Sequence, residues 1–135
     1  MNLIQAQQIC NLLNKNNGLS EPLSVSQILN TKRKYLTRSM GDVVACAAYR
    51  KRSWYQYEVL HVSVNENLRG WKFGQDLLSE IEVIARKDGI ALLQATCKEK
   101  NQASLSLFRK QGYSVVNTFK SKYSGDRLCL LQKIL

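Results

Sequence analysis

A strand that breaks into a turn and then a helix occupies residues 58–74, and this stretch constrains the fold most. Its sequence is E-V-L-H-V-S-V-N-E-N-L-R-G-W-K-F-G. We predict that the strand breaks at Asn65 and that a helix opens near Gly74. Two glycines, an arginine and a lysine lie within residues 69–74. Such a helix start offers backbone N–H groups and positive charge to a phosphate, and the alternative is an ordinary turn with surface cations.

The spacing of apolar residues predicts the other elements. We expect helices over residues 3–15, 22–30, 74–88 and 101–111. We expect strands over residues 35–40, 43–49, 54–64, 90–97, 113–119 and 128–134. A polar turn at 50–53 and a basic hairpin loop at 120–127 complete the order α-α-β-β-β-α-β-α-β-β. This order predicts a mixed α/β (α+β) fold.

The strand over residues 54–64 has an irregular alternation. Its apolar side chains take odd positions from Tyr55 to Val59 and even positions from Leu60 to Val64. One extra residue in a strand causes such a change, so we predict a β-bulge near Val59. The bulge would bring four polar side chains to one face, those of Gln56, Glu58, His61 and Ser63.

The length and the charge limit the class of protein. A chain of 135 residues suits a single domain, residues 1–135. The formal net charge of +10 predicts attraction to polyanions, which include nucleic acid, acidic proteins and phosphate-rich cofactors. A basic surface that only maintains solubility is the alternative.

Location and metal binding are predicted from what the sequence omits. No apolar run reaches the roughly 18 residues that a membrane span needs, and no signal peptide is recognisable, so we expect a cytoplasmic protein. The four cysteines lie far apart in apolar stretches. We therefore expect buried thiols and no structural metal.

Two sequence stretches at a characteristic separation resemble the GCN5-related N-acetyltransferase (GNAT) family. V-N-E-N-L-R-G-W-K-F-G-Q-D-L-L, from Val64, is similar to that family's strand end, pyrophosphate loop and long helix. N-Q-A-S-L-S-L-F-R-K-Q-G-Y, residues 101–113, is similar to its second signature. The resemblance covers about residues 31–134. It implies a GNAT-like acyl-CoA N-acyltransferase fold, with acetyl-CoA entering between two splayed strands. This sequence departs from that fold at its start, where we expect the usual first strand to be missing.

The resemblance also implies an activity, which is transfer of an acetyl group from acetyl-CoA to a primary amine. It assigns the acetyl and pantetheine portion to backbone groups of Val62 and Val64. The pyrophosphate would be bound by Arg69, Gly70, Trp71, Lys72, Phe73, Gly74 and Gln75. The pantetheine arm would lie along Asn101, Ser104 and Phe108.

Three side chains are candidates for proton transfer. Glu58 is the preferred general base, because a desolvated carboxylate has a raised pKa, and its alternative is a solvated strand glutamate. His61 is a second candidate base. Tyr123 is the candidate general acid, because Phe108 occupies the position of the family's usual tyrosine and has no proton to donate.

Two departures from the family pattern leave other functions open. Lys72 replaces the glycine that is usual in the pyrophosphate loop, and Phe108 replaces the tyrosine. One alternative is a GNAT-like binding module with impaired catalysis. Another is a basic protein that modifies or binds nucleic acid. The acceptor is unassigned by the sequence, and both a monomer and a homodimer remain open.

Overall fold

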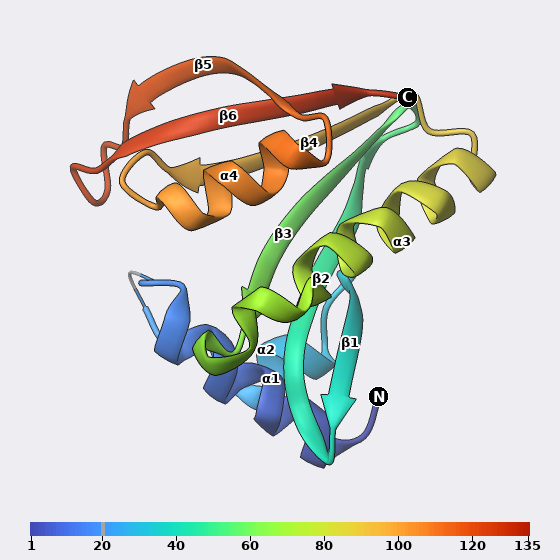
Figure 1. The fold of residues 1–135 in the computed structure, drawn as a ribbon, viewed down its shortest axis with the longest axis vertical. Coiled ribbons are helices and arrows are strands. Elements are labelled where there is room, and N and C mark those ends of the chain that lie inside the picture. Colours follow the sequence, from blue (N-terminus) through green and yellow to red (C-terminus); the bar gives the residue numbers. More distant parts are fainter. Residues whose placement is uncertain (20) are drawn as a thin grey trace. The chain divides into compact units, whose positions relative to one another are not determined.

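The computed structural model describes residues 1–19 and 21–135, and Figure 1 shows its elements. Along the chain they are α1 (Leu3–Asn16), α2 (Val25–Leu29), β1 (Lys34–Met40), β2 (Asp42–Ser53), β3 (Gln56–Val64), the 3-10 helix η1 (Glu66–Trp71), α3 (Phe73–Lys87), β4 (Leu92–Lys98), α4 (Gln102–Lys110), β5 (Ser114–Lys120) and β6 (Arg127–Ile134). Among the helices of the described residues, none has the length and apolar character to cross a membrane.

The six strands form a mixed sheet. Their hydrogen-bonded order is β1-β2-β3-β4-β6-β5. Strands β3 and β4 are parallel, with Gln56 opposite Leu92 and Val59 opposite Ala95. The pairs β1–β2, β4–β6 and β5–β6 are antiparallel. The sheet therefore combines hairpins with one βαβ crossover, as a mixed α/β fold requires.

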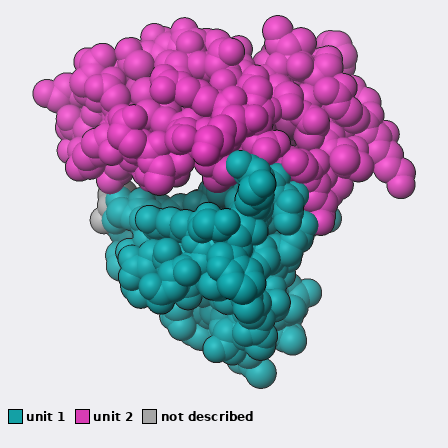
Figure 2. Space-filling model, viewed as in Figure 1, with its two compact units in different colours: residues 1–50, 61–77 teal, residues 51–60, 78–135 magenta. Residues whose placement is uncertain are grey.

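The chain divides into two compact units, which Figure 2 colours separately. Unit 1 comprises residues 1–50 and 61–77, and unit 2 comprises residues 51–60 and 78–135. Strand β3 and helix α3 each contribute residues to both units.

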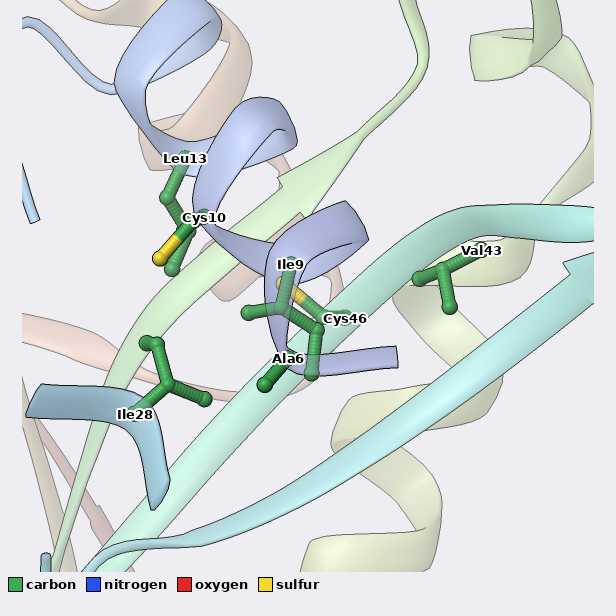
Figure 3. Close-up of a cluster of buried hydrophobic side chains, with 7 residues drawn as sticks. All are labelled: Ala6, Ile9, Cys10, Leu13, Ile28, Val43 and Cys46. Carbon is green, nitrogen blue, oxygen red and sulfur yellow. The ribbon is translucent and has the colours of Figure 1, made fainter. Parts of the chain in front are cut away.

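The core of unit 1 forms between α1, α2 and β2, as Figure 3 shows. One stripe of α1, spaced i, i+3, i+4, i+7, is buried and consists of Ala6, Ile9, Cys10 and Leu13. Ile28 of α2 and Val43 and Cys46 of β2 complete the cluster. Each fully buried large side chain contributes about 1.5–3 kcal/mol, so this packing fixes α1 against the strands.

The core of unit 2 is built from α3, α4, β4 and β6. Its fully buried or nearly buried side chains include Leu78, Ile81, Ala85, Leu93, Ala95, Leu105, Phe108 and Leu131. Tyr57 links strand and helix, because its hydroxyl donates to Asp88 Oδ2 at 2.5 Å just after α3 ends.

The predicted boundary between β2 and β3 was wrong. Residues 50–53 are not a turn, since β2 continues to Ser53 and the turn is at Trp54 and Tyr55. Polar side chains suit the exposed end of a strand as well as a turn, so their composition did not distinguish the two. Trp54 is 81% exposed as a consequence. Helix α2 is also shorter than predicted, because Ser24 caps it through a hydrogen bond from Gln27 N–H.

Strand β3 has an irregular residue close to the predicted bulge, and the bulge itself stays a prediction. His61 has φ 53°, a left-handed conformation that is rare outside glycine, whereas the bulge was expected near Val59. The predicted polar face is also wrong in part. Ser63 is only 5% exposed and is buried, so it does not share a solvent-facing row.

Candidate active site

The chain turns sharply where β3 ends, in unit 1. Asn65 N–H donates to Val44 O of β2 at 2.7 Å. The Asn65 side chain accepts from Asn67 N–H at 3.0 Å and starts η1. Asparagine favours such caps because its short side chain satisfies a backbone donor locally. The strand therefore ends at Val64 and the predicted break at Asn65 is confirmed.

Lys72 joins η1 to α3 in a left-handed conformation, with φ 64° and ψ 19°. A residue other than glycine loses roughly 1–2 kcal/mol there, which explains why a glycine is usual at this position of the pattern. Asp76 N–H donates to Lys72 O at 3.1 Å, the first bond of the helix. The N–H groups of Phe73, Gly74 and Gln75 precede that bond, so they have no acceptor within α3.

The start of α3 can therefore bind an anion. Its first-turn N–H groups and the positive end of the helix dipole favour negative charge, and Arg69 and Lys72 add two cations. Gly70 stays a predicted ligand of the pyrophosphate. It has no positive φ, and a Cβ there would meet no atom within 4 Å, so packing does not require glycine.

His61 is held in its strained conformation by side chains from β1 and β2. Its Nδ1 lies 2.7 Å from the Tyr35 hydroxyl, and the two rings stack with centroids 5.9 Å apart. Cys46 Sγ–H donates to His61 O at 3.4 Å. Burial raises the pKa of the Cys46 thiol to about 12, so it remains a donor at neutral pH. Burial also raises the pKa of Tyr35, which stays protonated.

Val62 and Val64 follow His61 and lie half-buried at the end of β3. Their carbonyl oxygens accept hydrogen bonds from two residues at the end of α1. Asn17 Nδ2 donates to Val62 O at 3.1 Å, and Asn16 Nδ2 donates to Val64 O at 3.2 Å. Neither asparagine was predicted as a site residue, since nothing local shows which carbonyl an amide at the end of a helix will reach.

Glu58 lies in the part of β3 that belongs to unit 2. It is half-buried and opposite Gln94 of β4, between the buried residues Tyr57 and Val59. Because side chains alternate along a strand, Glu58 lies on the face opposite those two core residues. Gln94 in turn accepts a hydrogen bond from Gln132 Nε2 at 2.9 Å. A half-buried carboxylate can accept a proton from an amine, so the chemistry of the site suits a general base.

Helix α4 positions the second group of predicted cofactor residues, also in unit 2. Asn101 caps it by accepting from Ser104 N–H at 3.1 Å. Ser104 is half-buried, whereas Phe108 is 4% exposed and packs edge-on against Tyr113 with ring centroids 5.0 Å apart. Phe108 is thus a core residue, and it supplies no proton.

Tyr123 lies on the turn between β5 and β6 and is fully exposed. Ser121 Oγ accepts its backbone N–H at 3.2 Å, so the turn has its own internal bonding. Its role as general acid stays a prediction. Among residues 1–19 and 21–135, no group of three His, Cys, Asp or Glu side chains is arranged to hold a metal ion.

Comparison with known proteins gives three kinds of match. A family model described as "Acetyltransferase (GNAT) family" matches residues 7–113. The IAA acetyltransferase of Azospirillum brasilense is 31% identical over 102 residues, which is 75% of this chain. That match spans 66% of the relative's length, just under two thirds.

Solved structures match over nearly the whole chain. The ribosomal-protein-alanine N-acetyltransferase of Brucella melitensis has a TM-score of 0.83 at 25% identity, over 100% of this chain and 97% of that one. An N-acetyltransferase of Staphylococcus aureus Mu50 has a TM-score of 0.84 at 19% identity, over 99% and 94%. The predicted fold class is thereby confirmed.

Proposed function

Because the chain belongs to the acetyltransferase (GNAT) family, we propose that it transfers the acetyl group of acetyl-CoA to a primary amine. Acetyl-CoA is the cofactor that this family uses, and one of the structural neighbours, an aminoglycoside 6'-N-acetyltransferase, is complexed with coenzyme A. The observation that carries the proposal is the left-handed turn at Lys72, which leads directly into the first turn of α3. This turn supports a diphosphate site, because it combines unpaired helix N–H groups with two cations.

The residues of unit 1 then have distinct roles in binding. Arg69 and Lys72 neutralise the charge of the diphosphate, and the N–H groups of Phe73, Gly74 and Gln75 donate to it. Backbone groups of Val62 and Val64 orient the acetyl and pantetheine portion. The bend at His61 sets the direction of that segment, which supports a role for the strained residue in positioning.

The residues of unit 2 have roles in proton transfer and in binding the pantetheine arm. Glu58 accepts the proton of the attacking amine, whose nitrogen forms the new bond to the acetyl carbon as the bond to sulfur breaks. Asn101 and Ser104 line the pantetheine arm. Phe108 gives no proton to the departing thiolate, so the thiolate leaves unassisted or takes a proton from Tyr123 or water.

The first test is binding followed by turnover. Saturating acetyl-CoA should raise the melting temperature, because a ligand that binds only the folded state stabilises it. An assay for released thiol with a panel of primary amines should then detect free CoA. No shift in melting temperature at saturating acetyl-CoA would reject the function.

Glu58→Gln tests the base. It should lower kcat by about 10²- to 10⁴-fold with little change in the affinity for acetyl-CoA, since the amide cannot accept the proton. Glu21→Gln removes the same charge from an exposed position and should leave kcat unchanged. An unaltered kcat in Glu58→Gln would exclude that role and direct attention to His61.

A second candidate is a binding module without turnover. The side chain of Phe108 favours it, because a phenyl ring has no proton to donate to a departing thiolate. Acetyl-CoA binding with no thiol release from any amine would support this candidate. Two further properties stay proposals, a cytoplasmic location and an assembly as either a monomer or a homodimer.

A further inference from the structure

The end of helix α1 reaches the end of β3 through two neighbouring asparagines. Asn17 Nδ2 donates to Val62 O at 3.1 Å. Asn16 Nδ2 donates both to Ser63 Oγ at 3.0 Å and to Val64 O at 3.2 Å. Three consecutive residues of the strand therefore have hydrogen bonds from a helix that is 45 or more residues away in the sequence.

The two bonds to backbone carbonyls, those of Val62 and Val64, lie on one edge of the strand. Asn65 N–H donates to Val44 O, so the backbone of Asn65 faces β2. Backbone groups of successive residues in a strand point to opposite edges, so those of Val64 and Val62 face away from β2. The two asparagine amides therefore bond the carbonyls of that edge.

The bonds hold a segment that is strained. His61 has φ 53°, and a left-handed residue other than glycine is unfavourable. Ser63 is a buried polar residue whose hydroxyl has Asn16 as a partner. Cys46 bonds the carbonyl of His61, so residues 61–64 are each fixed by at least one side-chain hydrogen bond.

We propose that Asn16 and Asn17 are positioning residues of the acyl-CoA site. This inference rests on the proposed function, in which Val62 and Val64 orient the acetyl and pantetheine portion. The amides fix the direction of the backbone groups on that edge without touching the reacting atoms. A misplacement of about 1 Å in such a segment can lower turnover by roughly 10²-fold, so a small change in α1 is transmitted to the chemistry.

Asn17→Asp tests the proposal, because it keeps the shape of the side chain and replaces the donor with an oxygen that repels Val62 O. Asn14→Asp is the matched control on the same helix. Asn14 donates to Leu23 O at 3.0 Å and accepts from Leu23 N–H at 2.7 Å, so its side chain bonds the segment before α2. Both variants lose one amide donor to a backbone carbonyl.

The positioning role predicts different kinetics for the two variants. Asn17→Asp should raise the KM for acetyl-CoA about tenfold, the effect of losing one well-placed hydrogen bond, whereas Asn14→Asp should lower only the melting temperature. If Asn17→Asp fails to fold, Asn17→Ala and Asn17→Gln replace it, and Gln should recover part of the affinity that Ala loses.

Equal falls in melting temperature with an unchanged KM and kcat in both variants would overturn the inference and leave a purely structural contact. That outcome differs from failure of the proposed function. In the latter case the wild-type protein itself shows no shift in melting temperature with acetyl-CoA, and the inference is rejected together with the function.

Discussion

At the scale of single residues, Lys72 combines a charge with an unfavourable conformation. Lys72→Gly removes the penalty of the left-handed region, although glycine also gains entropy in the unfolded chain. We expect the free energy of unfolding to rise by about 0.5–1 kcal/mol, measured by urea denaturation. A fall in stability would contradict this reading of the turn.

Two comparisons separate conformation from charge at this position. Gly41→Ala makes the opposite change at φ 78° in the β1–β2 turn and should lower stability by a similar amount. Lys72→Gln keeps the backbone strain and removes the charge, so it should weaken acetyl-CoA binding without altering stability. Lys72→Gly and Lys72→Gln both remove the charge. If the two variants have equal affinity for acetyl-CoA, the loss of affinity relative to the wild type is due to the charge alone.

At the scale of elements, one hydrogen bond connects β3 to the end of α3 within unit 2. Tyr57→Phe removes the hydroxyl that donates to Asp88 Oδ2 and leaves the ring in the core. A hydrogen bond to a charged group contributes about 1.5–3 kcal/mol, so the free energy of unfolding should fall by that amount. Urea denaturation measures the change.

The neighbouring tyrosine is the control for that element. Tyr55→Phe makes the same chemical change in the turn before β3, where the side chain is exposed, and its effect should stay within about 0.5 kcal/mol. Equal effects at the two positions would show that the bond to Asp88 adds nothing to the anchoring of α3.

The elements also show what local sequence predicts. The stripe Ala6, Ile9, Cys10 and Leu13 predicted α1, because a helix with one apolar face has that spacing wherever its partner lies. The end of β2 was not predicted, because hydrogen bonds to other strands decide whether polar residues extend a strand. The positive φ at His61 lies two residues after Val59, where a change of apolar parity predicted a bulge, because such a change gives only an approximate position.

At the scale of the whole molecule, the positive charge is unevenly compensated. Two acidic residues near the β5–β6 turn are already paired, Asp126 with Lys98 and Lys100, and Glu99 with Arg127. The hydrogen bond from Lys98 lowers the pKa of Asp126, so this pairing persists at mildly acidic pH. A basic group of three consecutive residues lies at the end of β2, namely Arg50, Lys51 and Arg52.

If that basic group binds polyanions, affinity for a DNA duplex should fall steeply with salt. Neutralising Arg50, Lys51 and Arg52 to Gln should reduce the slope of log affinity against log salt by about 2 to 3, one counterion for each lost phosphate contact. Neutralising Lys15, Lys87 and Lys110 instead changes the net charge equally at other places. The same slope in both triple variants would reject a local site.

The candidate site was predictable from the sequence only in part. The helix starts near Gly74 and at Asn101 were predicted because their signals are local, with each turn or cap residue beside the helix that it starts. Asn16 and Asn17 were missed because their role depends on a strand more than forty residues away, which local sequence does not specify. Phe108 packs against Tyr113 in the core of unit 2, and its contact with the pantetheine arm stays a prediction.

The way in which the chain alternates between its two units has a practical consequence for dissection. The polypeptide passes from one unit to the other after residue 50, after residue 60 within β3, and after residue 77 within α3. No single cut, by protease or by stop codon, yields a fragment that contains one unit whole and nothing of the other. If the chain is cut once and the two pieces are expressed separately, at least one unit is divided between them. That unit can form only when the two pieces associate.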